Sequence, residues 1–300
     1  MLVAIGADGV PGGWIAAACH AGEAAWGKAR SSRRLPPPGK RRVELHLCRK
    51  VGEIAELRAA SEAIVAIDVP IGLPEHGGAR PCDTEARRLL GKLASSVFNP
   101  PARYLFPALD KATGEERWQE AQRLVREQQA KYGGEPIVAV SRQAVGILEK
   151  VRDADTYLRR HPDAEDWLIE CHPEVSFLRM NGGEPLAPKA KAKGALQRLA
   201  LVEREFPGTT RALEERELAE HVPLAERVPL ADLLDAHAAR RPMLAGLWSR
   251  SRPQTRKGWA GAERKGFRSG ARRGSTRCER RAGRGRAVCW ARLPPCALGR

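Results

Sequence analysis

The sequence predicts an α/β fold in which three antiparallel strands, a helix and a returning strand form a mixed sheet. Residues 2–8 are a short apolar run, and glycines and a proline at 9–13 separate it from a second apolar run at 14–19. Residues 43–48 alternate between apolar and polar side chains, which is typical of a strand with one buried face. Residues 63–68 are apolar up to a final aspartate, which is typical of a buried parallel strand.

The connection between these strands predicts where two aspartates meet. Apolar residues recur at helical spacing over residues 51–60, so we expect a helix there. A right-handed crossover through this helix places the strand at 63–68 parallel to the first strand and beside it. Asp8 and Asp68 are then expected at neighbouring carboxyl ends of the sheet, where open α/β sheets bind ligands.

The rest of the chain predicts a helical insertion and a return to the sheet. Residues 74–161 are expected to be mainly helical, with a short helix capped by Asp83 and closed by Gly91. Two longer amphipathic helices are expected within this insertion, at 115–131 and 141–159. Beyond it we expect one further strand and two closing helices, at 167–172, 193–205 and 230–240.

The basic charge of the chain is concentrated at its C-terminal end. The net charge is +16, but 16 of the 52 Lys and Arg residues lie in residues 249–300, where only two acidic residues occur. Residues 1–248 are therefore close to neutral and are expected to form one domain. The composition of 249–300 predicts a disordered basic tail. A shift of reading frame near Pro242 would produce the same kind of amino-acid composition, and both explanations stay open.

The cysteines and the apolar runs indicate the redox environment of the protein and whether it crosses a membrane. No Cys-x-x-Cys pair occurs, and Cys19, Cys48 and Cys171 lie in strand-like apolar runs, where buried reduced thiols are the ordinary interpretation. We therefore expect a reducing, cytoplasmic environment. No targeting segment is expected before the first strand, and no apolar run reaches the roughly 18 residues needed to cross a bilayer.

Acidic residues at the ends of these elements form a candidate metal site with the ligands Asp8, Asp68, Asp232 and Asp235. The last two are three residues apart on one helix and share a face. Magnesium and manganese prefer oxygen ligands, and two such ions can activate water and stabilise a leaving oxygen in phosphoryl transfer. We therefore predict a site for two Mg²⁺ or Mn²⁺ ions.

Further residues of this site are predicted from their positions. Glu170 is expected to be an additional ligand or to orient the water, so the predicted catalytic acids are Asp8, Asp68, Glu170 and Asp235. His172 is a weaker catalytic candidate, for proton transfer to the leaving group. Arg80, Arg87 and Arg103 lie near the segment 95–98 and are candidate contacts to the phosphates of a nucleic acid.

Simpler interpretations exist for several of these residues. Asp8 precedes a glycine and also fits a turn, Asp232 fits the first turn of a helix, and His172 fits a satisfied core position. The three arginines also fit a solvated helix face. Asp68 is the strongest candidate, because an unpaired carboxylate after five apolar residues would be costly.

The same residues carry a resemblance to a known family. Over residues 3 to about 239, the sequence resembles the proteins grouped as domain of unknown function 429. The matching motifs occur in the family's order at 6–14, 66–74, 80–83, 85–87, 90–91, 95–101 with Arg103, 170–177 and 189–199. Individually these motifs are weak, but together they are highly specific.

The resemblance implies a ribonuclease H-like fold and a metal-dependent nuclease, because the family is regarded as predicted nucleases of that fold. Its members look similar in layout to junction resolvases, with acids on the first and fourth strands and a final helix carrying Asp-x-x-Asp-Ala. Residues 232–236 fit that final element. The chain departs from the family pattern at 240–242, where Pro242 would break the helix.

Two other classes of function remain open at this stage. An actin-like phosphotransferase would share the sheet order, but such enzymes normally carry the fold twice, and one Asp-Gly hairpin occurs here. A non-catalytic nucleic-acid-binding protein would use the arginine-rich tail as a salt-sensitive arm. The placement of five acids at these positions favours the nuclease, with DNA or RNA as its partner. The sequence does not decide the oligomeric state.

Overall fold

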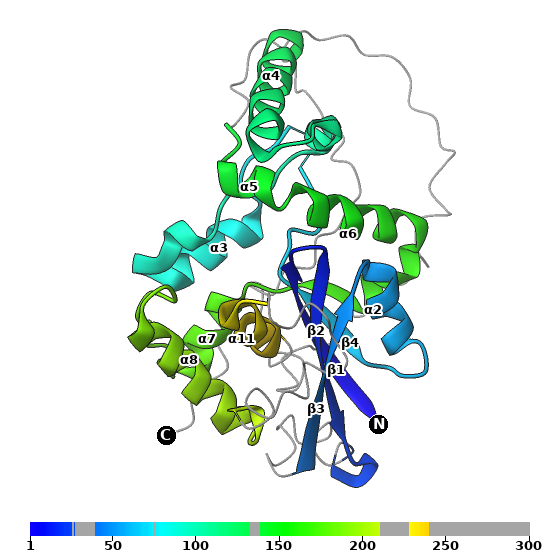
Figure 1. The fold of residues 1–300 in the computed structure, drawn as a ribbon, viewed down its shortest axis with the longest axis vertical. Helices are drawn as coiled ribbons and strands as arrows, with labels where there is room; N and C mark the ends of the chain where they lie inside the picture. Colours follow the sequence, from blue (N-terminus) through cyan, green and yellow to red (C-terminus); the bar gives the residue numbers. More distant parts are fainter. Residues whose placement is uncertain (26, 28–39, 75, 133–138, 211–227, 240–300) are drawn as a thin grey trace, which may run out of the picture.

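A mixed five-stranded sheet lies at the centre of the computed structural model, which describes residues 1–25, 27, 40–74, 76–132, 139–210 and 228–239. The strand order is β3-β2-β1-β4-β5 (Figure 1). β2 pairs antiparallel with both β1 and β3, whereas β4 pairs parallel with both β1 and β5. The strands span Leu2–Val10 (β1), Gly13–Ala21 (β2), Arg41–Cys48 (β3), Ile64–Ile67 (β4) and Leu168–Glu170 (β5). The predicted mixed sheet is confirmed.

The β1–β2 hairpin depends on two glycines. Gly12 has a φ of 79°, a left-handed conformation that glycine adopts without strain. A Cβ on Gly13 would lie 2.2 Å from the carbonyl oxygen of Cys48, so β3 can approach β2 only at a glycine. Both strands are longer than the sequence suggested. Asp8 therefore lies within β1, paired with Ile15, and not in the turn.

Helices surround this sheet. They are α2 (Val51–Arg58), α3 (Pro81–Leu90), α4 (Gly114–Tyr132), α5 (Arg142–Gly146), α6 (Leu148–Arg160), α7 (Pro173–Met180), α8 (Ala192–Glu205) and α11 (Leu230–Ala239). Short 3₁₀ helices are η2 (Gly91–Ser96), η3 (Arg103–Asp110) and η4 (Pro162–Asp166). α3 to α6 lie between β4 and β5 in the chain, and Figure 1 shows α4 and α5 beyond the end of the sheet.

Two expectations within this helical part need correction. The single helix expected at 141–159 is divided into α5 and α6, which meet at Ile147. Asp83 is not the N-cap residue of α3, because Arg80 occupies the N-cap position. Asp83 lies in the first turn and accepts a hydrogen bond from the Arg80 backbone N–H, and Gly91 closes the helix with a φ of 53°.

Helices cover both faces of the sheet. One apolar cluster joins the sheet to α2 and α6 and includes Trp14, Ile54 and Val151. A second cluster joins the sheet to α7, α8 and α11 and includes Phe177 and Val202. Near-continuous apolar strands are what a sheet buried on both faces requires.

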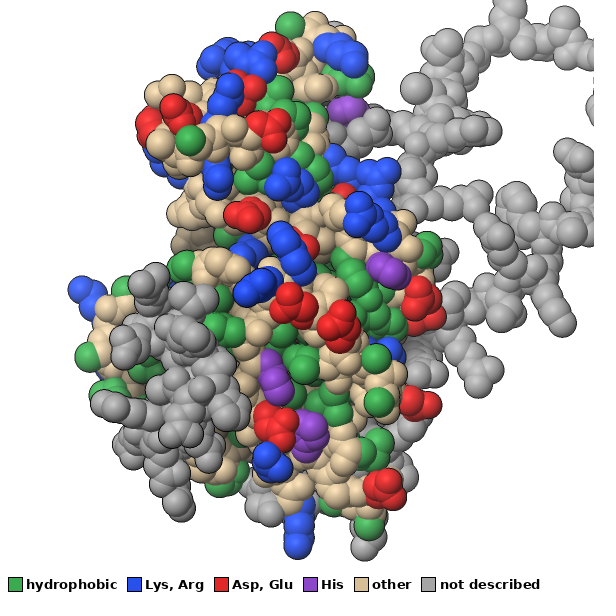
Figure 2. All heavy atoms as spheres, turned by 45° about the vertical axis from the view of Figure 1, so that its right-hand side comes forward, with side chains coloured by type: hydrophobic (Ala, Val, Ile, Leu, Met, Phe, Trp, Pro, Cys, Tyr) green, Lys and Arg blue, Asp and Glu red, His purple; other side chains and the backbone are tan. Residues whose placement is uncertain are grey.

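The remaining expectations concern the whole chain. Cys19, Cys48, Cys82 and Cys171 are buried, and they form no disulfide among the described residues. The predicted tail at 249–300 lies outside the described residues. Among the described residues, none of the helices is both long and apolar enough to span a membrane. On the face drawn in Figure 2, basic and acidic side chains are interspersed, in keeping with the balanced charge of residues 1–248.

Asp153 provides a test of how α6 is joined to the sheet. Its Oδ2 accepts hydrogen bonds from Trp14 Nε1 and from the Val51 N–H, both at 2.9 Å. Asp153→Ala would leave the buried indole N–H without this partner. We expect a loss of about 1–3 kcal/mol in the free energy of unfolding, measured by urea denaturation.

Arg152→Ala is the matched control, because Arg152 is an exposed neighbour on the same helix. We expect this variant to stay within about 0.5 kcal/mol of the unmodified protein. Equal stability of Asp153→Ala and the unmodified protein would show that this contact does not hold α6 to the sheet.

Candidate metal centre

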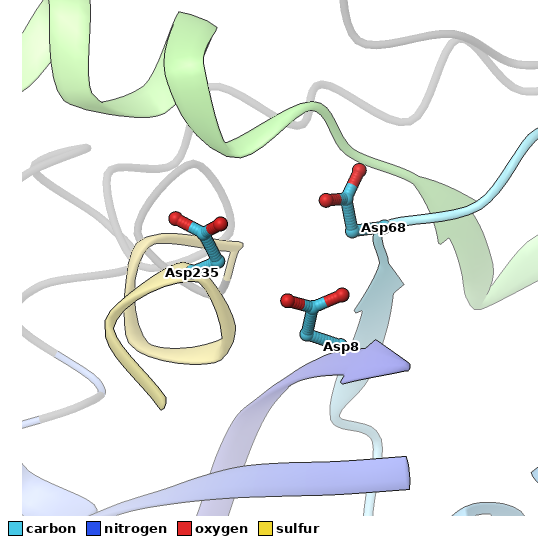
Figure 3. Close-up of side chains that lie close together, drawn as sticks. All are labelled: Asp8, Asp68 and Asp235. Atoms are coloured by element: carbon cyan, nitrogen blue, oxygen red, sulfur yellow. The ribbon is translucent and has the colours of Figure 1, made fainter. Parts of the chain in front are cut away.

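Three aspartates from three separate elements converge at the carboxyl end of the sheet (Figure 3). Asp8 lies in β1, Asp68 directly follows β4, and Asp235 lies on α11. One carboxylate oxygen from each lies within 4.8 Å of the others. The predicted proximity of Asp8 and Asp68 is confirmed, and Asp235 joins them.

The sheet register brings Asp8 and Asp68 together. Ala7 and Ile67 are partners in the parallel β1–β4 pair, and each directly precedes one of the aspartates. The Asp68 N–H donates to the Ala7 carbonyl oxygen at 3.0 Å, which extends the pairing by one step. Asp8 Oδ1 accepts a hydrogen bond from the Gly9 N–H at 2.7 Å, which fixes the orientation of that carboxylate.

Asp235 is carried to the cluster by a largely apolar helix. Leu233, Leu234 and Ala236 on α11 are buried, and the helix packs against β1, β2, α7 and α8. Asp235 is only 3% exposed. Its Oδ2 accepts a hydrogen bond from Lys189 Nζ at 2.9 Å, whereas its Oδ1 is buried and has no partner among the described residues.

Burial makes negative charge costly at all three positions. It raises the pKa of Asp8 well above its usual range, and the charges of Asp68 and Asp235 raise it further. Burial and then the charge of Asp235 raise the pKa of Asp68 well above its usual range, whereas Lys189 lowers it. Burial also raises the pKa of Asp235, again opposed by Lys189. Three ionised carboxylates therefore need a compensating cation here.

The cluster opens into a cavity of about 340 Å³. Asp8, Asp68, Asp235 and Lys189 line one part of it, and Glu170 and His172 also reach it. Its size is within the usual range for small-ligand sites. The donor set fits a divalent ion, because it offers hard oxygen ligands, one of which, Asp235 Oδ1, has no hydrogen-bond partner in the described part of the chain.

Asp232 lies near the cluster but outside the group of three. It is in the first turn of α11 and is partly exposed. Its charge raises the pKa of Asp8, so the two carboxylates interact. Its assignment as a metal ligand stays a prediction.

Glu170 and Arg80 form a buried ion pair at the edge of the cavity. Arg80 Nη2 donates to Glu170 Oε1 at 2.6 Å, and Arg80 Nη1 donates to Glu170 Oε2 at 2.7 Å. Arg80 also binds Asp83 at both carboxylate oxygens and the Ile71 carbonyl oxygen, and it is only 7% exposed. These contacts anchor both side chains at the edge of the cavity. The phosphate contact of Arg80, and the role of Glu170 as a metal ligand or in orienting the water, stay predictions.

The other two predicted phosphate contacts also have partners within the protein. Arg87 donates to the Val97 carbonyl oxygen and to Asn99 Oδ1. Arg103 binds both oxygens of Asp155 but remains 43% exposed. Arg103 is therefore the more accessible of the two, and the phosphate-binding role of both residues stays a prediction.

His172 is partly buried at the start of α7. Its Nε2 lies 3.3 Å from the Ser96 carbonyl oxygen, and its buried Nδ1 has no partner among the described residues. Burial lowers the pKa of His172 below its usual value. The neutral imidazole is therefore favoured at pH 7.

Sequence reasoning missed the segment that carries Lys189. Arg198, which is 1% exposed, binds both oxygens of Glu174 and donates to the Ala187 carbonyl oxygen. Lys189 and Arg198 fall within the motif at 189–199, but that motif assigned them no role. A lysine in a polar loop carries no local signal of a contact with a residue 46 positions away.

Comparison with known proteins finds a matching family model. No curated protein and no solved structure matches the chain. A family model described as "Protein of unknown function (DUF429)" matches residues 6–241, which include all three aspartates of the cluster and Lys189. The chain therefore belongs to the DUF429 family.

Proposed function

We propose that this protein is a metal-dependent nuclease of ribonuclease H-like fold, in which Asp8, Asp68 and Asp235 hold Mg²⁺ or Mn²⁺. The observation that carries the proposal is the convergence of three carboxylates from β1, the end of β4 and α11. Asp235 Oδ1 has no other partner among the described residues, which supports a ligand role.

The topology supports the same proposal. Three antiparallel strands are followed by a helix and by strands that add in parallel on the other side of β1. The acids lie on the first strand, after the fourth strand and on a late helix. This is the layout that the family resemblance implied for a ribonuclease H-like nuclease, and membership of the family adds to its weight.

The chemistry follows from the ligand set. A bound pair of divalent ions would supply an activated water and stabilise the leaving oxygen of a phosphodiester. Asp8, Asp68 and Asp235 would hold these ions, and Asp232 would add negative charge beside them. Glu170, held by Arg80, would keep the cavity wall in place. A neutral His172 is a poor proton donor, so we assign the leaving group's proton to water.

Cleavage assays test the proposal directly. Asp8→Asn and Asp68→Asn preserve shape but remove charge from the ion-binding cluster. Each single change should abolish most Mn²⁺- or Mg²⁺-dependent cleavage of single-stranded, duplex or branched DNA or RNA. The double variant should add little to the loss, because the acids hold the ions as one unit.

Asp110→Asn is the control for these variants, because it makes the same chemical change at an exposed position at the end of η3. It should cleave at the rate of the unmodified protein. Full cleavage by Asp68→Asn would rule out the metal-site mechanism. Isothermal titration with Mn²⁺ gives the number of ions bound, which we expect to be two.

The pH dependence of stability gives a second test. The pKa of Asp68 is raised in the folded protein, above an unfolded value of about 3.9. Without metal, the folded state therefore binds more protons, and its stability falls as pH rises from about 4 through the raised pKa. Asp68→Asn removes this contribution, so its stability relative to the unmodified protein should increase with pH.

Urea denaturation at several pH values in the presence of a chelator measures this difference. Saturating Mn²⁺ should cancel the fall in the stability of the unmodified protein with rising pH, because the ion compensates the ionised carboxylates. A difference between the two proteins that does not change with pH would contradict the assigned electrostatics of the cluster.

A further inference from the structure

We infer that Lys189 is a built-in counter-cation of the acidic cluster, and that it competes with the divalent ion for Asp235. The inference rests on the proposed function, because it concerns the same site. It assigns to Lys189 a role in setting the affinity for metal.

The contacts of Lys189 place its charge at the cluster. Its Nζ lies 2.9 Å from Asp235 Oδ2 and faces the cavity that Asp8 and Asp68 also line. The side chain of Lys189 is 49% exposed, whereas that of Asp235 is 4% exposed. The ammonium group therefore reaches a buried carboxylate from the solvent side. Burial lowers the pKa of Lys189, but the charges of Asp235, Asp68 and Asp8 outweigh burial and raise it, so the ammonium interacts with the whole cluster.

The backbone before Lys189 is held firmly in place. The Ala187 N–H donates to Gln197 Oε1, and the Ala187 carbonyl oxygen accepts from Arg198 Nη1. A Cβ on Gly194 would lie 2.2 Å from the Pro188 carbonyl oxygen, so α8 can approach this segment only at a glycine. These contacts fix the backbone from which the Lys189 side chain extends to reach Asp235.

Competition follows from the charges. A divalent ion that binds Asp235 through Oδ2 must displace the ammonium group from that oxygen. An ion that binds through Oδ1, for which the described residues offer no hydrogen-bond partner, would instead lie close to the ammonium and be repelled by it. In both cases Lys189 weakens metal binding. Without metal, the same lysine stabilises the ionised carboxylates, so it has opposite effects on the metal-free and metal-bound proteins.

Titration of the full chain with Mn²⁺ tests the inference without any assay of cleavage. Lys189→Met keeps most of the side-chain length and removes the charge. A neighbouring charge shifts ionic equilibria by about one to three log units, so we expect Lys189→Met to bind Mn²⁺ at least about tenfold more tightly. Lys189→Gln should show the same direction, and Lys189→Arg should show no gain.

Lys193→Met is the matched control, because it removes the same charge from an exposed residue in the first turn of α8. Its Mn²⁺ affinity should equal that of the unmodified protein. The melting temperature gives a second readout. Lys189→Met should melt lower than the unmodified protein without metal, and Mn²⁺ should raise its melting temperature by more. A purely structural lysine would lower both melting temperatures equally.

The outcomes separate this inference from the proposed function. If the unmodified protein binds Mn²⁺ and Asp68→Asn does not, but Lys189→Met and Lys189→Gln bind no more tightly, the inference is wrong and the metal site stands. If the unmodified protein does not bind Mn²⁺, both fail. Tighter binding by Lys193→Met would also overturn the inference, because the effect would then be one of overall charge.

Discussion

Ionised carboxylates repel one another, and burial makes each of them more costly, so Asp8, Asp68 and Asp235 share one cavity only because the fold forces them together. The β1–β4 register fixes the first two, and the apolar faces of α11 fix the third. The stability of the sheet and its helices therefore offsets an electrostatic cost at one end. Such a cost is expected at a functional site, where residues needed for chemistry are kept although they destabilise the fold locally.

The same constraint explains the cations around the cavity. Arg80 compensates Glu170 and Asp83, and Lys189 compensates Asp235. The arginine is almost fully enclosed and its donors are used, which suits a permanent anchor. The lysine is half exposed at the end of a flexible stem, which suits an exchangeable partner. This difference separates the cation that supports the cavity from the one that competes with metal.

The sequence predicted the sheet and the meeting of Asp8 and Asp68, because apolar runs ending in a carboxylate reveal both a strand and its end. It favoured Asp235 over Asp232 as a catalytic acid but predicted both as metal ligands, because they share a helix face. The packing of α11 brings Asp235 into the group of three. The pairing of Arg80 with Glu170 joins residues 90 positions apart. No local sequence pattern predicts such a contact. The three arginines predicted to contact phosphate also have hydrogen-bond partners within the protein.

Direct localisation of the metal is the measurement closest to the central claim. Crystals grown with Mn²⁺ would give an anomalous difference map that marks each bound ion independently of any activity. We predict two peaks at the carboxylates of Asp8, Asp68 and Asp235, with oxygen ligands at about 2.0–2.3 Å, and Lys189 Nζ moved away from Asp235. The absence of a peak at saturating Mn²⁺, with Lys189 still bound to Asp235, would contradict it.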